Sequence, residues 1–303
     1  MQISLIMADR NCSPLRYPGG KSCLTEFLTE IALVNNLTNG IYIELFAGGA
    51  GAALNLLFNG TYRHIHINDY DTHIFSMWNA ILNYTDDFLR KIEETEITIS
   101  EWHRQREIFE QADVDKVVDL GFSTFFLNRT NRSGIIFKAG PIGGLEQNGN
   151  YLIDVRFNKI KLSERIKKIA TYRNQITISN LDALALINDL EDLYPNERQL
   201  FIYLDPPYYK KGKLLYMNNY SHENHLQLRQ IIDLRLQRHN WIISYDNVQE
   251  IREIYNGYRM SSFDLKYSLQ SKKFGSELLI FSDEIGLCDN LTIHNRSTVI
   301  ELL

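Results

Sequence analysis

The stretch IYIELFAGGAGAALNLLFN, residues 41–59, predicts the fold of this chain. Its apolar run, glycine-rich turn and helically spaced apolar residues indicate a strand, a tight turn and a helix in that order. The segments HIHIND (64–69) and THIFSMWNAILNY (72–84) then predict a second strand and a second helix. A strand–helix–strand–helix unit is typical of a parallel sheet with helical crossovers.

The pattern changes after this unit and later returns. Residues 76–170 are mostly helical and loop-like, and they contain the glycine-rich stretch SGIIFKAGPIGGLEQNGNY (133–151), so we predict an insert with its own small lobe. Beyond it, alternating strand and helix segments resume, and two final strand segments predict an antiparallel hairpin at the sheet edge. The predicted fold is α/β, with a mixed, mostly parallel sheet. Its core comprises residues 1–75 and 171–285, followed by a peripheral tail at 286–303.

Composition excludes several classes of protein. The chain has 303 residues, of which 44% are hydrophobic and 23% charged, as in an ordinary globular protein. We find no apolar run long enough for a membrane span and no signal peptide. Cys12, Cys23 and Cys288 are widely spaced, and the eight histidines are scattered, so we expect reduced thiols, no metal and a cytoplasmic protein.

Charge is unevenly distributed along the chain. The net charge is −5, yet residues 129–173 hold ten Lys or Arg and only three acids. A basic segment on an acidic body favours contact with nucleic acid. The alternative is a solvated helix face, which suits LSERIKKIATYR (162–173) taken alone.

The glycine turn ELFAGGAGA (44–52) lets the backbone approach a ligand closely. Its spacing fits neither the dinucleotide fingerprint nor a phosphate-binding P-loop. Asp69 ends the next strand, where an acid can bind a ribose diol. These residues predict a ribose-bearing cofactor without a demand for phosphate; the alternative is an ordinary strand–helix turn.

Before this unit, SPLRYPGGKS (13–22) places Lys21 in the first turn of a helix. A cation is disfavoured there by the helix dipole, which suggests a task such as binding a ligand carboxylate. The alternative is a lysine that faces solvent.

The stretch LDPPYY (204–209) carries the most specific signal. Asp205 ends a predicted core strand, and ligands of open α/β sheets bind at such ends. Its carboxylate and the Pro206 carbonyl can accept hydrogen bonds from one NH2 group, while Pro206 and Pro207 stiffen the turn and Tyr208 offers a flat face. This pattern predicts activation of an exocyclic amine on a planar base; the alternative is a rigid turn with a satisfied aspartate.

These motifs resemble those of the Dam-like N6-adenine DNA methyltransferases of the D12 class, from about residue 13 to about residue 282. The resemblance rests on PLRYPGGK, ELFAGGAG, INDYD, FFLNRTNRSGI, GPIGG, RFNK, DPPYY, SYDN and GSELLIFS. The order of the motifs is that of the alpha class. One departure is Ala50, which stands where the family often has a glycine, with Gly51 displaced by one.

The resemblance implies a Rossmann-like methyltransferase sheet, S-adenosylmethionine as cofactor, and an adenine-specific enzyme acting on a flipped base in duplex DNA. Lys21 would lie near the methionine carboxylate, Asp69 would bind the ribose and Asp182 the adenine amine. Asp205 would hold the target N6 and Tyr208 would stack on the base. The implied cofactor residues are Tyr17, Lys21, Phe46, Gly48, Asp69, Asp182 and Asp205, and the catalytic residues are Asp205, Pro206, Pro207 and Tyr208.

The insert is expected to read DNA through Asn128, Arg129, Asn131 and Arg132, with Arg16 as a further contact. The alternative is a polar loop that holds itself together. We expect a monomer that binds double-stranded DNA and no membrane, in a bacterial cell or as a phage protein in its host. A restriction endonuclease partner stays open, as do N4-cytosine or protein-amide transfer and a catalytically silent DNA-binding homologue.

Overall fold

The computed structural model describes residues 12–16, 20–195, 197–210, 220–267, 273–287, 292–293 and 296–297. Tyr17, one of the predicted cofactor residues, lies outside this set.

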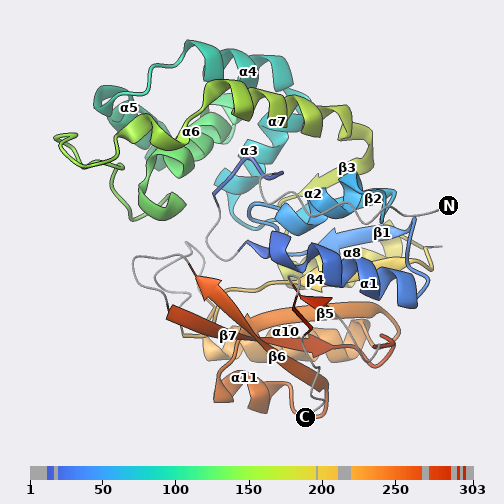
Figure 1. Cartoon of the computed structure of the whole chain (residues 1–303). Coiled ribbons are helices and arrows are strands. Elements are labelled where there is room, and N and C mark those ends of the chain that lie inside the picture. The colour runs from blue at the N-terminus through green and yellow to red at the C-terminus, as the bar shows by residue number, and fades with distance from the viewer. Residues whose placement is uncertain are drawn as a thin grey trace.

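A seven-stranded sheet in the order β3-β2-β1-β4-β5-β7-β6 forms the centre of the molecule (Figure 1). Strands β1 to β5 run parallel, and β7 lies antiparallel to both β5 and β6. The predicted mostly parallel sheet with a terminal hairpin is therefore confirmed. The strands are β1 (Ile41–Glu44), β2 (His64–Asn68), β3 (Ile176–Ser179), β4 (Leu200–Leu204), β5 (Asn240–Asp246), β6 (Arg259–Tyr267) and β7 (Lys273–Phe281), with a separate pair β8 (Thr292–Ile293) and β9 (Arg296–Ser297).

Helices occupy the predicted crossovers and the insert. The core helices are η1 (Lys21–Leu24), α1 (Thr25–Val34), α2 (Gly51–Phe58), α3 (Thr72–Asn83), α8 (Ala183–Leu193), α10 (His222–Arg235) and the short α11 (Gln249–Ile254), which the sequence did not predict. The predicted boundary between core and insert, at residues 75 and 76, falls inside α3. The insert holds α4 (Thr85–Glu94), α5 (Ile99–Gln111), α6 (Val117–Thr130), η2 (Arg132–Gly134), η3 (Ile153–Arg156) and α7 (Lys159–Thr171), and η4 (Arg173–Gln175) leads into β3. Within the described residues, no helix combines the length and apolarity that crossing a bilayer requires.

The sheet is covered on both faces because its strands are apolar on both sides. Tyr42 of β1 faces a core shared with α1, α2 and α3, whereas its neighbours Ile41 and Ile43 face a second core with α8, α10 and α11. Side chains alternate between the faces of a strand, so the fully buried run in β1 serves both cores. The result is a three-layer arrangement with the sheet in the middle.

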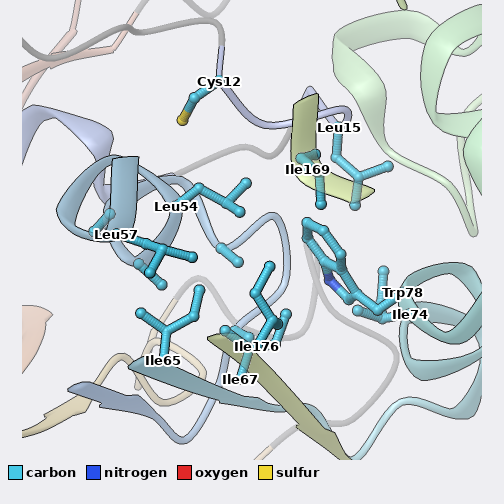
Figure 2. Packing of buried hydrophobic residues seen from close by; sticks show 14 of the residues in the cluster. Cys12, Leu15, Leu54, Leu57, Ile65, Ile67, Ile74, Trp78, Ile169 and Ile176 are labelled. Atoms are coloured by element: carbon cyan, nitrogen blue, oxygen red, sulfur yellow. The ribbon is translucent and has the colours of Figure 1, made fainter. Parts of the chain in front are cut away.

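The insert packs on the same core as one face of the sheet. Figure 2 shows Trp78 of α3 and Ile169 of α7 close to Leu15 and to Ile67 of β2. The cluster continues into the insert through the aromatic side chains of α6, including Phe122. The helices α3 to α7 gather above the sheet in Figure 1, at one side of its strands. Because the apolar core is continuous, the insert and the sheet support each other.

Candidate active site

The site lies where the strand order of the sheet reverses. From β1 the chain moves outward to β2 and β3, and from β4 it moves outward in the other direction to β5. Loops leaving the carboxyl ends of two such neighbouring strands diverge and leave a crevice between them. The loop after β1 carries Phe46 and Gly48, and the loop after β4 carries Asp205 to Tyr208. The sheet thus brings the two strongest sequence motifs side by side.

Hydrogen bonds fix the glycine turn after β1. Gly48 has a φ of +46°, and its N–H donates to Asp69 Oδ2 at 2.7 Å. Trp78 Nε1 donates to the Gly48 carbonyl at 3.0 Å. Ala50 caps α2 in the left-handed conformation, at φ +47°, that a glycine adopts at less cost. Ala50 thus takes the left-handed conformation at the position where the family pattern often has a glycine.

Asp69 ends up beside the glycine turn, at the carboxyl end of β2. Its second oxygen, Oδ1, accepts the Asp71 N–H at 2.9 Å. Burial, reinforced by the Asp71 charge and opposed by the Gly48 and Asp71 amides, raises the pKa of Asp69 to about 7. Asn68 fixes this strand end, because its amide donates to the carbonyls of Leu45 and Leu181 at 3.0 and 2.9 Å.

Phe46 and Asp182 stand at the same edge of the sheet. Asp182 is exposed, and its Oδ1 caps α8 by accepting the Leu184 N–H at 2.9 Å. The half-buried ring of Phe46 lies edge-on to Tyr220, with ring centroids 5.8 Å apart. Burial and, secondarily, the Asp182 charge raise the pKa of Tyr220. An apolar wall and an exposed carboxylate are therefore close together, and Tyr220 is a member that sequence reasoning missed.

Among the described residues, Asp205 is held through one of its two carboxylate oxygens, Oδ1. Ser244 Oγ donates to Oδ1 at 2.7 Å, and Lys21 Nζ lies 2.8 Å from the same atom. Ser244 in turn bonds Tyr203 at 2.7 Å. Among the described residues none binds Oδ2, and the side chain is 15% exposed. Burial, opposed by Lys21 and reinforced by Glu277, raises the pKa of Asp205. The carboxylate is fixed in place and keeps one acceptor for a ligand.

Lys21 is buried, which excludes the solvent-facing alternative. Its side chain is 2% exposed, and Nζ donates to the Tyr208 hydroxyl at 3.2 Å and lies 3.6 Å from Glu277 Oε2. Burial by itself lowers the pKa of Lys21, but the Asp205 and Glu277 carboxylates outweigh it and raise that pKa well above its usual value. The structure places the ammonium inside the protein, beside the Asp205 and Glu277 carboxylates, and its role toward a cofactor carboxylate stays a prediction.

The loop after β4 is anchored at both ends of its Asp-Pro-Pro-Tyr segment. Tyr208 is 4% exposed and its hydroxyl donates to Glu277 Oε1, while Lys21 lies 5.2 Å from its ring centroid. Asp246 accepts the backbone N–H groups of Tyr209 and Lys210 at 2.8 and 3.1 Å. The sequence analysis did not assign Asp246 or Glu277 to the site. The available signal was an acid within the apolar strands SYD and SELLIF.

Asn128 and Asn131 are fully buried and hydrogen-bonded within the protein. The Asn128 amide accepts the Arg16 N–H at 2.7 Å and donates to the Gly134 carbonyl at 2.8 Å. Asn131 accepts the indole N–H of Trp102 at 2.7 Å and donates to the Ile135 carbonyl at 2.9 Å. Their polar groups are used, so this conformation does not offer them to base edges. The structure favours the alternative of a self-supporting loop, whereas Arg132 in η2 is exposed.

Four arginines from separate parts of the chain lie near one another, and we call them the arginine cluster. They are Arg16, Arg129 of α6, Arg156 of η3 and Arg165 of α7. Arg129 donates to the Arg156 carbonyl, and Arg165 donates to the Ser13 carbonyl at 2.8 Å. Burial and the charges of the other three lower the pKa of Arg129. Within the described part of the chain, no carboxylate forms an ion pair with Arg16, Arg129 or Arg156.

Residues 12–16 connect the arginine cluster to the glycine turn. Ser13 Oγ donates to the Gly49 carbonyl at 2.5 Å, and Cys12 Sγ to the Gly51 carbonyl at 3.3 Å. Three residues later, the backbone of Arg16 is bound by Asn128. The segment therefore joins the loop after β1 to the end of α6.

Comparison with known proteins gives the family of the chain. A search of curated proteins finds no match. Two solved structures have low similarity: a Pyrococcus horikoshii protein assigned as an RNA methyltransferase (9% identity, 92% of this chain and 94% of that one, TM-score 0.40) and the rRNA methyltransferase AviRa from Streptomyces viridochromogenes (12%, 87% and 85%, 0.37). The family model described as D12 class N6 adenine-specific DNA methyltransferase matches residues 17–269. The chain belongs to this family and is an adenine-specific DNA methyltransferase.

Proposed function

We propose that the protein transfers the methyl group of S-adenosylmethionine to N6 of an adenine rotated out of duplex DNA. The observation that carries this proposal is the state of Asp205: Oδ1 is fixed by Ser244 and Lys21, and among the described residues nothing binds Oδ2. A carboxylate held in this way is preorganised to accept a hydrogen bond from an amino group. It stands at the sheet position where α/β enzymes bind their ligands.

The residues around the crevice fit a cofactor with a ribose, an adenine and no phosphate. Asp69, at the end of β2, can accept hydrogen bonds from a ribose diol in place of the backbone amides it now binds. Asp182 is exposed and has an oxygen beyond the one that caps α8, which suits an adenine amine. Phe46 gives an apolar wall. When bound, S-adenosylmethionine supplies an electrophilic methyl group.

The chain itself positions and activates the amine. Asp205 Oδ2 and the Pro206 carbonyl accept hydrogen bonds from the two N6–H groups, which makes the nitrogen lone pair available for attack. Rotating a base out of a duplex costs about a few kcal/mol, and these hydrogen bonds and stacking against Tyr208 offset that cost. Because burial raises the pKa of Asp205, Oδ2 can hold the proton that N6 releases.

The arginine cluster supports duplex DNA as the substrate. Guanidinium groups that lie together favour an external polyanion, and phosphates are their usual partner. Among the described residues no carboxylate pairs with Arg16, Arg129 or Arg156. Residues 12–16 tie this cluster to the glycine turn, so a bound DNA backbone would lie next to the crevice. Arg132 is exposed and stays our candidate for a base contact.

The test is product analysis after reaction with methyl-labelled S-adenosylmethionine and duplex DNA. We expect the label in N6-methyladenine, and Asp205→Ala should reduce incorporation by at least about a hundredfold while keeping the fold measured by circular dichroism. Label in N4-methylcytosine would mean that the enzyme methylates the cytosine amine instead of the adenine amine. A wild-type protein that binds S-adenosylmethionine but labels no DNA would contradict the proposal.

A further inference from the structure

Glu277 is a buried carboxylate in the middle of an apolar strand. It is 1% exposed, and the residues that follow it in β7, Leu278 to Phe281, are all buried apolar side chains. It pairs in register with Asp246 of β5 and Phe263 of β6, so it lies in the interior of the sheet. Burying a carboxylate is costly unless partners compensate for its lost hydration. The partners of Glu277 therefore indicate why an acid stands there.

The pleat of β7 directs Glu277 to the face of the sheet that packs against α1. Alternate residues share a face, so Glu277 shares its face with Leu279 and Phe281, which belong to the core under α1. Phe281 packs edge-on against Phe27 of α1, with ring centroids 6.5 Å apart. The helical turn that begins with Lys21 precedes α1 directly. Glu277 therefore lies on the face of the sheet that α1 covers, the side from which η1 contributes Lys21.

Both oxygens of Glu277 point to site residues. Oε1 accepts the hydroxyl proton of Tyr208, and Oε2 lies 3.6 Å from the Lys21 ammonium. Lys21 itself lies 2.8 Å from Asp205 Oδ1. Glu277 therefore contacts the proposed stacking ring directly and the proposed amine-binding carboxylate through one lysine. It lies on neither ligand-binding loop, so among the described residues its effect on a reaction passes through Tyr208 and Lys21.

This inference rests on the proposed function and adds a residue to it. We infer that Glu277 is a positioning residue for methyl transfer, which holds the Tyr208 ring by its hydroxyl and shares Lys21 with Asp205. Two consequences follow from the geometry. The ring cannot tilt freely, because it is bound at the atom farthest from its backbone attachment. The ammonium is divided between two carboxylates, so it does not neutralise Asp205 alone and leaves that acid a better acceptor.

The decisive variants are Glu277→Gln and Tyr208→Phe, alone and combined. Glutamine keeps the shape and removes the charge, and phenylalanine keeps the ring and removes the hydroxyl. We expect Glu277→Gln to lower kcat/KM for DNA methylation about tenfold to a hundredfold, counted per cofactor-binding site, because small misplacements at a reacting centre have effects of this size. In the Tyr208→Phe background, Glu277→Gln should lower kcat/KM by a much smaller factor, because part of its effect passes through the Tyr208 hydroxyl, which is already missing.

A second readout separates positioning from a purely structural role. Since the Glu277 charge helps to raise the pKa of Asp205, its removal should move the acid limb of the kcat/KM profile to lower pH. A structural defect would reduce the number of active molecules and leave this limb in place. The matched control is Glu284→Gln, an exposed acid after the same strand, which should match the wild type in rate and profile.

The outcomes are distinct. Additive losses in the double variant, or a Glu277→Gln enzyme with wild-type kcat/KM and pH profile, overturn the positioning role. If Glu277→Gln does not fold, Tyr208→Phe alone decides: a wild-type kcat/KM in that variant overturns the role, and a loss of at least about fivefold supports it. A wild-type protein that methylates no adenine overturns the proposed function, whereas an active wild type with unaffected variants overturns only this inference.

Discussion

Two groups of charged side chains in this protein are built on opposite principles. In the lysine–carboxylate cluster, Lys21 of η1 lies between two acids. These are Asp205, in the loop after β4, and Glu277 of β7. In the arginine cluster the charges have one sign, and the guanidinium groups donate to backbone carbonyls such as those of Arg156 and Ser13. Ion pairs link the charges of the first group, whereas among the described residues no carboxylate pairs with Arg16, Arg129 or Arg156 of the second group.

Under the proposed function, the first cluster belongs to the place where the reaction is prepared and the second to the place where DNA docks. A buried cation with two carboxylates is a preorganised element whose geometry depends on the protein alone. Like charges held together repel each other, and an anion that lies among them removes this repulsion. We therefore expect substitutions in the first cluster to affect the folded state strongly. Substitutions in the arginine cluster should act mainly on the complex with DNA.

The largest effect should come from Lys21→Met, which leaves two buried carboxylates without their cation. Removing one partner of a buried ion pair typically costs about 3–5 kcal/mol, so the free energy of unfolding should fall by that amount. Chemical denaturation measures it. Lys116→Met is the matched control, because Lys116 is exposed in its pair with Asp113 and its loss should have no measurable effect. Equal free energies of unfolding in the two variants would contradict a structural role for the lysine–carboxylate cluster.

The fold could be predicted because its signals are local. Apolar periodicity and the turn after residue 44 were enough to predict β1, α2, β2 and α3, and these elements are present. The short α11 was missed, since Gln249–Ile254 is only six residues long and gives a weak periodic signal.

The site could be predicted only in part, because its pairings join distant parts of the chain. Asp205 and Asp69 follow their strands directly, so the end of each strand locates them. The contact between Lys21 and Glu277 depends on how β7 inserts beside β5, which residue types do not reveal. The same limit explains Asn128: its amide could face DNA or the protein, and only packing decides.

The next largest effect should show which polar residues of the insert stabilise the protein and which bind DNA. Asn128→Ala removes a buried amide that joins Arg16 to Gly134, so it should lower the free energy of unfolding by about 1–3 kcal/mol. Arg132→Ala, at an exposed position, should keep the wild-type stability and weaken DNA binding instead. Denaturation and DNA titration of both variants give the answer. An Asn128→Ala variant with wild-type stability and impaired DNA binding would instead support the predicted contact between Asn128 and a base.

A smaller effect concerns Asp69, an acid of the core that backbone amides bind. Because its pKa is raised to about 7, this group is largely protonated below that pH and ionised above it. The ionised form is the stronger acceptor for the two ribose hydroxyls, so affinity should rise with pH, by about tenfold from about pH 6 to about pH 8. The ligand 5′-methylthioadenosine has the ribose but no titrating amino acid group, which makes it the suitable probe for calorimetry.

Asp69→Asn serves as the control for this measurement. The amide does not ionise in this range, so binding of 5′-methylthioadenosine should be weaker at pH 8 and independent of pH. A pH dependence that persists in Asp69→Asn would mean that another group controls ribose binding.

The smallest expected effect tests the arginine cluster itself. Arg156 is exposed, and its backbone carbonyl, not its side chain, binds Arg129, so Arg156→Gln removes one charge and leaves that hydrogen bond in place. We expect DNA affinity to fall by about threefold for all sequences, and the slope of log K against log salt to become shallower by about one. Stability should not decrease, because the substitution relieves repulsion from Arg16 and Arg129. Lys116→Gln, at an exposed position outside the cluster, should leave the salt slope unchanged. An unchanged slope in Arg156→Gln would mean that the repulsion among these arginines is not relieved by phosphate, and the contrast between the two charge clusters would lose its functional meaning.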